Sequence, residues 1–272
     1  MMNHQPIKIC SFGRRSHSRS IKNVKNAFLE NPANIPEDIN ETHRSTLENY
    51  SHKNIIREPD DMRRLFELVL PTESLWKPGR EIRIAFMGGT KKIKDKVRSI
   101  GNEWLQYANL KFKYITDPEL AHIRIAFNKL QGSWSGLGTD NLSYDSNEPT
   151  MNFGWLDADT PEDEFRGVVL HEYGHMMGCG HEHESPKNGG IPWDKPKALK
   201  YYMETQGWSE EEVQEQVFDR YSHDQIRGTR LDKKSIMMYA IPNSITIGNF
   251  QVGWNNELSA KDKSYIKKIY KR

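Results

Sequence analysis

The sequence feature that most constrains this chain is the stretch HEYGHMMGCGH, which begins at His171 and ends at His181. It has the pattern H-E-x-x-H-x-x-G-x-x-H. Residues four apart share one face of an α-helix, so His171 and His175 can present two imidazole nitrogens to a single metal ion. Gly178 can adopt the positive φ that ends a helix and turns the chain back, and this turn would bring His181 round as a third ligand.

Three neutral imidazoles leave one open position on a tetrahedral Zn²⁺, which is the pattern of a catalytic zinc site. A water molecule in that position becomes more acidic, and Glu172, which follows His171 on the helix, can accept its proton. The alternative is a helix with unrelated surface histidines, but a chance match is on the order of one in ten thousand for a chain of this length. We therefore expect one zinc ion per chain, bound by His171, His175 and His181.

Length and charge limit the class of protein. The chain has 272 residues, enough for one large domain or for one domain with an extension. Its 39 basic and 37 acidic residues nearly balance, which gives no reason to expect a nucleic acid or an anionic membrane as partner. We expect a protein or peptide substrate as the partner, and a monomer.

Targeting signals are not evident in the sequence. No apolar run approaches the roughly 20 residues that span a membrane, and residues 1–20 lack the apolar core of a secretory signal. The location is therefore open: the chain stays in the cytosol, leaves by a route that the sequence does not display, or has lost its signal. The two cysteines, Cys10 and Cys179, are too few for a disulfide framework, so we expect free thiols.

Charge and apolar content divide the chain near residue 60. Residues 1–30 are basic, residues 31–61 are mainly acidic, and apolar residues are sparse in both. We interpret residues 1–60 as an N-terminal extension, partly disordered or draped over the rest, that serves as a pro-segment or a solvated arm. Residues 61–272 would then form the catalytic domain.

The pattern of apolar residues predicts an α+β domain. Alternating β-rich runs indicate strands, and an amphipathic run between the first two indicates a helix packed on a mixed sheet. A run that opens with proline indicates a short strand at a sheet edge. The expected elements are helices at 60–70 and 90–107, strands at 81–87, 110–115, 122–127 and 149–154, and a loop at 131–148.

Helix-start signals follow in the second half of the chain. Residues 160–163 (TPED) offer a threonine N-cap, a proline for the first turn and acids near the helix dipole, so a helix should run from here into the zinc motif. Residues 209–212 form a capping box, and residues 259–262 cap a final helix. Residues 183–208 and 222–258 are expected to be irregular.

Two motifs together carry a resemblance to a known family. The zinc motif, followed by the run Ser235–Tyr239 (SIMMY), resembles the metzincin zinc endopeptidases. Glu182 directly after the third histidine, and Tyr239 two residues after Met237, are similar to the astacin-like subgroup. The resemblance covers about residues 75–272, and further similarities to microbial astacin-like domains lie at 137–140, 149–154 and 191–195.

The resemblance implies the fold of a metzincin-type zincin. In that fold a cleft runs between an upper mixed-sheet subdomain and a lower irregular one, the zinc helix forms the cleft floor, and a helix ends the domain. Residues 149–154 match the edge strand of the family, which pairs with an extended substrate as with an added β-strand. The resemblance also suggests an exported protein.

The resemblance also implies roles for site residues. The three histidines match the zinc ligands, and Glu172 matches the general base. Met237 matches the methionine of a turn beneath the metal, and Tyr239 matches a tyrosine that can ligate zinc and move to the oxyanion of the reaction. Glu182 matches a glutamate that bonds the processed N-terminus. Residues 183–186 depart from the charged residues usual in the family, and the chain lacks cysteines for the family's disulfides.

These features predict a zinc-dependent endopeptidase that uses an activated water and Glu172. The alternative is a zinc-binding, catalytically silent protein-interaction module, although such a module would not need Glu172. Cys10 is expected to be a free thiol, but as a thiolate it could reach the zinc and hold the enzyme latent. His183 is expected at the surface or behind the ligands.

Overall fold

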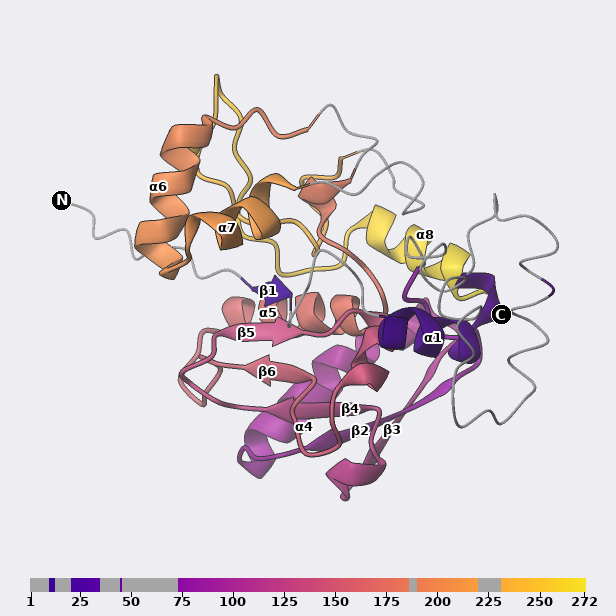
Figure 1. Ribbon diagram of the computed structural model, residues 1–272. Coiled ribbons are helices and arrows are strands. Elements are labelled where there is room, and N and C mark those ends of the chain that lie inside the picture. Colours follow the sequence, from indigo (N-terminus) through magenta and orange to yellow (C-terminus); the bar gives the residue numbers. More distant parts are fainter. Residues whose placement is uncertain (1–9, 13–20, 35–44, 46–72, 186–189, 220–230) are drawn as a thin grey trace.

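Helix α5 (Glu162–Met176) divides the molecule into two parts. The computed structural model describes residues 10–12, 21–34, 45, 73–185, 190–219 and 231–272. In Figure 1 strands β2 to β6 and α4 lie on one side of α5, and α6 and α7 lie on the other. We call residues 73–180 the N-terminal subdomain and the described residues of 181–258 the C-terminal subdomain. The helix expected at 60–70 lies outside the described residues.

A mixed six-stranded sheet consists of five strands of the N-terminal subdomain and of β1, which comes from residues 11–12. Its strand order is β1-β5-β6-β4-β2-β3, and every neighbouring pair is parallel except β5 with β6. The expected mixed sheet and its strands near residues 81, 110 and 122 are confirmed. The strands are β1 (Ser11–Phe12), β2 (Glu81–Phe86), β3 (Lys111–Ile115), β4 (Ile123–Ala126), β5 (Ser133–Ser135) and β6 (Met151–Phe153).

The edge of the sheet differs from the expectation. β6, within the run 149–154, lies between β4 and β5, so the prediction that it forms the edge is wrong. Pro149 precedes the strand, where it removes no ladder hydrogen bond and is compatible with a central position. The strand of the N-terminal subdomain that lies farthest from the edge strand β3 is β5, inside the run 131–148 expected to be loop. Three residues are too few for an alternating pattern to stand out.

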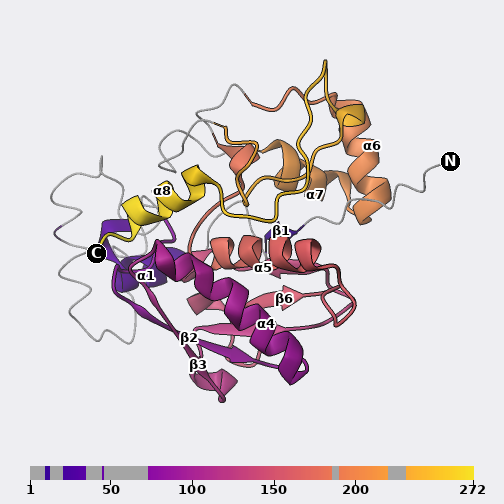
Figure 2. The same ribbon diagram turned by 180° about the vertical axis from the view of Figure 1, so that it is seen from behind.

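Helices α4 (Lys91–Gly101) and α5 cover one face of this sheet, as the view from behind shows (Figure 2). α4 begins after its capping residue Thr90 and continues as a 3-10 turn to Gln106, which confirms the helix expected here. Gly101 lies against the ring of Tyr173 on α5, and a methyl group at this position would overlap the ring. The absence of a side chain therefore lets the two helices pack closely.

The remaining helical elements lie mostly in the C-terminal half. Within the described part of the chain, every helix is too short or too polar to cross a bilayer. The helices are α1 (Ile21–Glu30), α6 (Lys195–Gln206), α7 (Glu210–Val213), a π-helical turn (Gln214–Phe218) and α8 (Ala260–Ile269). Short 3-10 turns lie at Pro32–Asn34, Pro118–Leu120, Gly138–Ser143, Glu182–Glu184 and Asn243–Ile245.

The expected helix caps are confirmed at two positions and wrong at a third. Ser209 and Ser259 form the capping boxes that open α7 and α8. Thr160 does not cap α5, because its hydroxyl bonds to the carbonyl oxygen of Trp155 and to Asp157. α5 therefore begins after Pro161, with its acidic first turn as expected.

Helix α6 lies in a run that was expected to be irregular because of its prolines and glycines. Pro196 stands in the first turn of α6, where a helix needs no backbone N–H donor, and the side chain of Asp194 caps that turn. Gly207, with a φ of +70°, ends the helix. The prediction that residues 183–208 are irregular is therefore wrong for α6, because Pro196 marks the start of a helix and not a break.

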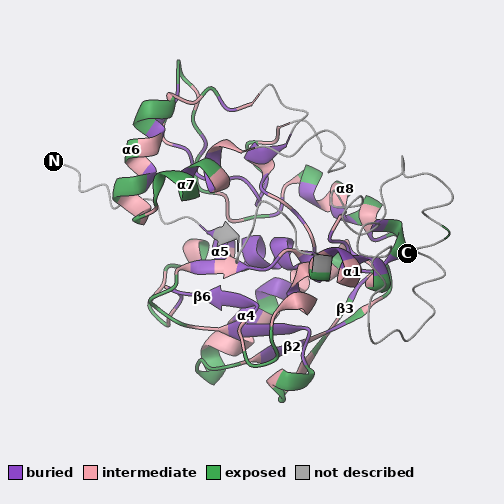
Figure 3. Cartoon of the chain, in the orientation of Figure 1, coloured by how far each residue is buried: buried purple, intermediate pink, exposed green. Residues whose placement is uncertain are grey.

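Two hydrophobic cores lie on either side of α5, whose last turns are buried from both sides (Figure 3). The larger core packs the sheet against α4, α5 and α8, and two of its tryptophans bond to α5 directly. Trp104 Nε1 donates to the Leu170 carbonyl oxygen at 3.0 Å, and Trp76 Nε1 donates to that of Met176 at 2.8 Å. The smaller core packs α6 and α7 against the loops of the C-terminal subdomain.

Part of the N-terminal extension packs on the N-terminal subdomain. Val24 and Phe28 of α1 are completely buried. Asn34, after α1, binds the main chain of Leu75 twice: its Nδ2 donates to the carbonyl oxygen at 2.8 Å, and its Oδ1 accepts from the N–H at 3.1 Å. The described part of the extension is therefore draped over the domain, which is one of the two expected forms.

Asp262, in the first turn of α8, fixes the turn that contains Met237. Its carboxylate accepts hydrogen bonds from Ser235 Oγ at 2.6 Å and from the backbone N–H of Ile236 at 2.8 Å. Asp262 is buried, and burial raises the pKa of its carboxyl, against the hydrogen bonds that lower it. The position of this turn therefore depends on a charged group near the end of the chain.

We expect Asp262→Ala to lower the free energy of unfolding by about 3 kcal/mol, because two buried donors lose their charged acceptor. Asp262→Asn keeps one acceptor oxygen and should lose less. Urea denaturation followed by circular dichroism measures both variants. An unchanged midpoint for Asp262→Ala would show that other contacts hold the turn.

Candidate active site

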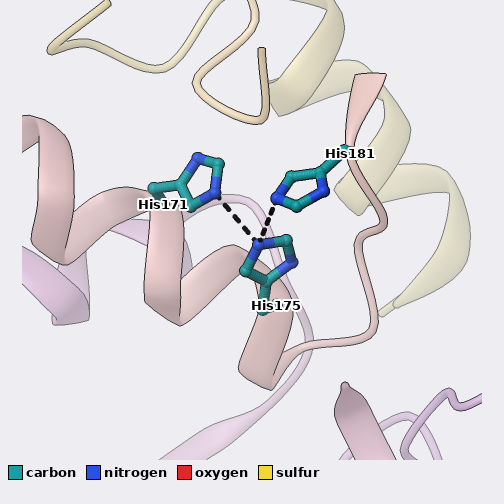
Figure 4. Close-up of side chains that lie close together, drawn as sticks. All are labelled: His171, His175 and His181. Atoms are coloured by element: carbon teal, nitrogen blue, oxygen red, sulfur yellow. Dashed lines mark hydrogen bonds between the residues drawn. The ribbon is translucent and has the colours of Figure 1, made fainter. Parts of the chain in front are cut away.

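The three histidines of the motif converge at the C-terminal end of α5 (Figure 4). α5 presents His171 and His175 one turn apart, and the chain that follows it brings His181 beside them. Nε2 of His175 lies 3.0 Å from Nε2 of His171 and 3.1 Å from Nε2 of His181. All three side chains are buried, and together they form a group that could hold a metal ion.

Gly178 allows the chain to return to the site after α5. Its φ is +92°, a left-handed conformation that favours glycine, as the sequence predicted. A methyl group at this position would also press on the carbonyl oxygen of Ser74 at 3.0 Å. The N–H of Gly178 donates to the carbonyl oxygen of His175 at 2.8 Å and so closes the last turn of the helix.

Hydrogen bonds on the outer side of two rings fix the position of the proton. Nδ1 of His171 faces the carbonyl oxygen of Ile236, and Nδ1 of His175 faces that of Cys179, each at 2.8 Å. A carbonyl oxygen only accepts, so each Nδ1 carries the hydrogen and each Nε2 presents a lone pair. Two lone pairs that face each other at 3.0 Å repel, and a cation between them removes the repulsion.

The histidine group fits a zinc ion. Three nitrogens that each lie about 2.0–2.1 Å from a tetrahedral zinc are roughly 3.3 Å apart, close to the observed Nε2 separations of 3.0 and 3.1 Å. Burial lowers the pKa of His171 to about 4, although its bond to Ile236 acts in the opposite direction. The neutral ring, which is the form that binds a metal, is therefore favoured at neutral pH.

Glu172 follows His171 on α5 and is buried like the three histidines. Its side chain is fully buried, and within the described residues its carboxylate has no nitrogen or hydroxyl donor and interacts with the weakly donating thiol of Cys10. Burial raises the pKa of its carboxyl well above the ordinary value, while the neighbouring Cys10 thiol lowers it. A buried carboxylate with no stronger donor than a thiol is unusual in a purely structural site and suits a group that exchanges a proton.

The turn methionine packs against the helix that carries the first two histidines. The sulfur of Met237 lies against Gly174, and a methyl group on Gly174 would overlap it. The carbonyl oxygen of Met237 accepts a hydrogen bond from the N–H of Glu182 at 3.0 Å, directly after the third histidine. The methionine turn therefore contacts both chain segments that supply histidines.

Tyr239 and His183 pack against His181 from the C-terminal subdomain. The ring centroid of Tyr239 lies 4.3 Å from that of His181 and 4.6 Å from that of His183. His183 is buried, and its Nε2 faces the carbonyl oxygen of Gln216 at 3.1 Å. Of the two expected positions, the structure therefore places His183 behind the histidine group and not at the surface.

A segment of the N-terminal extension crosses the site. Residues 11–12 form β1, which pairs in parallel with residues 134–135 of β5. Cys10, the residue before β1, is buried, and its carbonyl oxygen accepts a hydrogen bond from the hydroxyl of Tyr239 at 2.5 Å. Burial and the nearby Glu172 raise the pKa of the Cys10 thiol.

The placement of Cys10 bears on the hypothesis that it is a zinc ligand. Cys10 is a free, buried thiol, and so is Cys179, as expected. The side chain of Cys10 interacts with Glu172, but Cys10 belongs to neither described group of residues that could hold a metal ion. The structure thus brings Cys10 to Glu172 and to the cavity that His171 also lines, and its role as a zinc ligand stays a prediction.

Two carboxylates near the third histidine have different partners. Glu182 accepts a hydrogen bond from the N–H of Asp232 at 2.8 Å, and burial raises the pKa of its carboxyl to about 7. Its expected bond to a processed N-terminus stays a prediction. Glu184 is not among the residues predicted from the sequence. Its Oε1 atom lies 3.4 Å from Nδ1 of His181. A carboxylate three residues after a histidine, in a tight turn, is the signal that could have found it.

Comparison with known proteins places this geometry in a family. A structure of myroilysin is 41% identical, covers 73% of this chain and 96% of that chain, and has a TM-score of 0.70. A crystal structure of myroilysin has the same identity, covers 73% and 86%, and has a TM-score of 0.58. No protein-family model and no curated protein matches the chain.

A more distant structure agrees in fold alone. High choriolytic enzyme 1, a hatching enzyme zinc-protease from Oryzias latipes (medaka fish), is 15% identical, covers 72% of this chain and 94% of that chain, and has a TM-score of 0.50. The 41% identity to myroilysin spans nearly all of the shorter myroilysin chain, and the buried histidine group agrees with zinc as the cofactor. The chain therefore belongs to the metzincin zinc metalloproteases and carries an astacin-like domain.

Proposed function

We propose that the protein is an astacin-like endopeptidase that hydrolyses peptide bonds at the buried histidine group. The three histidines are the zinc ligands, and Glu172 is the general base. The observation that supports this most is an extended piece of peptide in the site. Cys10 contacts Glu172 with its side chain and accepts a hydrogen bond from Tyr239 with its carbonyl oxygen. A peptide substrate would need to make contacts of this kind.

Glu172 moves the proton in this proposal. A bound zinc ion supplies Lewis acidity, which polarises the scissile carbonyl and makes an attacking water more acidic. Glu172 accepts a proton from that water and later gives it to the nitrogen of the leaving amine. Burial supports this role, because the raised pKa makes Glu172 a stronger base than an exposed carboxylate.

Tyr239 stabilises the oxygen of the scissile bond in this proposal. Its hydroxyl donates to a peptide carbonyl, that of Cys10, beside the histidine group. Burial raises the pKa of Tyr239 well above its ordinary value and so keeps the hydroxyl protonated as a donor. A donor aimed at a carbonyl oxygen becomes more stabilising as negative charge develops there.

The alternative function is a silent zinc module that binds other proteins. Such a module needs the three histidines and their partners, but it gains nothing from a buried carboxylate that has no stronger donor than a thiol. Within the described residues Glu172 is in that situation, so its burial costs stability, and a binding module has no use for the group that carries this cost. This observation favours the endopeptidase.

The extension keeps the enzyme latent in the same proposal. We divide the chain into residues 1–60 as a pro-segment and 61–272 as the catalytic domain. β1 covers β5, and the Cys10 carbonyl occupies the Tyr239 hydroxyl, so a substrate cannot use either while the segment is bound. α1 anchors the extension through the buried Val24 and Phe28.

Latency also fits a site of action outside the cell. An endopeptidase that accepts extended peptides would damage the proteins of the cell that makes it, and a segment in the site prevents this until export. Activity against casein in the culture medium and not in the cell fraction would support this location. Activity that stays with the cytoplasmic fraction would count against it.

We expect Glu172→Gln to retain one zinc per chain and to lose cleavage of unfolded casein by roughly 10²–10⁴-fold, since the amide cannot accept the proton. Zinc content and cleavage are measured on the same sample. Glu119→Gln, an exposed site on a distant 3-10 turn, serves as the control. Cleavage at the wild-type rate in Glu172→Gln would refute the mechanism, and zinc binding without cleavage in the activated wild type would favour the silent module.

Tyr239→Phe should lower kcat by about 10²-fold, because the oxygen of the scissile bond loses a donor. KM and zinc content should change little, since the ring still packs on His181. Steady-state kinetics on a fluorogenic peptide measures this split. A rise in KM with an unchanged kcat would instead assign Tyr239 to substrate binding alone.

The latency proposal predicts that a chain beginning at Ile21 cleaves at least about tenfold faster than the full chain, because β1 and Cys10 are absent while α1 remains. A chain beginning at Cys10 is the matched control and should stay latent. Cys10→Ser in the full chain separates two causes: activation would assign latency to the thiol, and continued latency would assign it to the backbone segment. Equal rates for all chains would refute the pro-segment.

A further inference from the structure

The three zinc-site histidines do not have equivalent partners on their outer nitrogens. Nδ1 of His171 and Nδ1 of His175 each face a backbone carbonyl oxygen at 2.8 Å. Nδ1 of His181 faces instead the carboxylate oxygen Oε1 of Glu184 at 3.4 Å. One ring of the group therefore has an anionic partner where the other two have neutral ones.

Glu184 is held beside His181 by the turn that follows the third histidine. It ends the 3-10 turn Glu182–Glu184, its backbone N–H donates to the His181 carbonyl oxygen at 3.2 Å, and its side chain is buried. Burial and, after it, the nearby Glu184 carboxylate raise the pKa of the Tyr239 hydroxyl. The turn therefore fixes a negative charge behind the third ring and beside Tyr239.

We propose that Glu184 is a positioning residue for the zinc site: its carboxylate accepts the Nδ1–H of His181, orients the ring and makes Nε2 a stronger donor to the metal. This rests on the proposed function, in which His181 is a zinc ligand. A carboxylate behind a ligating histidine fixes the tautomer and raises the basicity of the ring. The loop position of His181 gives it more need of such support than the two histidines on α5.

Two other roles for Glu184 fit the geometry less well. As a ligand in its own right it would need to reach the shared position of the three Nε2 atoms, but it faces Nδ1, on the opposite side of the His181 ring. The described residues group Glu184 with His181 and His183, and not with His171 or His175. A second metal there would compete with Nδ1 of His181, which carries the hydrogen that Glu184 accepts.

The test compares zinc affinity in the full chain, by competition with a chromophoric chelator, for wild type, Glu184→Gln and Glu184→Ala. We expect Glu184→Ala to bind zinc about 10–100-fold more weakly and Glu184→Gln to fall between it and wild type, since the amide oxygen still accepts but carries no charge. Glu182→Gln is the matched control, because it makes the same chemical change on the same turn at a side chain that bonds to Asp232. It should stay within about threefold of wild type.

Two further readouts separate positioning from general stability. In thermal unfolding, zinc-free wild type and zinc-free Glu184→Gln should have the same melting temperature. A purely structural role would instead lower both the melting temperature of the zinc-free protein and the zinc affinity. The visible spectrum of the cobalt-substituted protein should shift in Glu184→Gln and not in Glu182→Gln. Zinc affinity and cobalt spectrum unchanged in both Glu184 variants would overturn the proposal.

The test of the role of Glu184 does not depend on whether the protein cleaves peptides. If wild type binds zinc but cleaves no peptide even without residues 1–20, the proposed function fails, while the affinities still decide the role of Glu184. If cleavage depends on Glu172 as expected and the Glu184 variants bind zinc like wild type, the endopeptidase stands and the positioning role is wrong.

Discussion

The rest of the structure depends on holding three imidazole lone pairs against one another in a buried space. Nε2 atoms at 3.0 and 3.1 Å repel in the absence of a cation, so the fold must supply rigid support from outside the group. That support comes from carbonyl oxygens behind two rings and a carboxylate behind the third. The fold therefore holds the three lone pairs close together, and a bound metal ion removes the repulsion between them.

The packing around α5 supplies this rigid support for the histidines. α5 lies between two cores, and tryptophans from the larger core bond to carbonyl oxygens on its last turns. Close approach is permitted where side chains are missing: Gly101 admits the ring of Tyr173, and Gly174 admits the sulfur of Met237. Asp262 then ties the methionine turn to α8. The two subdomains thus meet at the histidines through packing that a single added methyl group would disturb.

Much of the site was predictable because its chemistry is encoded in local spacing. The i, i+4 histidines and the glycine with positive φ need only the geometry of one helix and one turn, and both are found as expected. The prediction of an edge position for β6 is wrong because its neighbour β5 has only three residues, and no local pattern shows that β5 pairs with it. α6 was missed because its proline stands where a helix tolerates one, and only the finished helix shows that position.

The sequence by itself determined the candidate ligands, the candidate base and the mixed sheet, since each follows from periodicity or from a motif within a few residues. Tertiary structure alone decided that Cys10 lies beside Glu172 and under Tyr239, although the chain separates them by more than 160 residues. It also decided that Glu184 faces Nδ1 of His181 and that Asp262 holds the methionine turn. These contacts depend on how separate elements pack in space, and no local pattern in the chain specifies the distance between two side chains that meet only after folding.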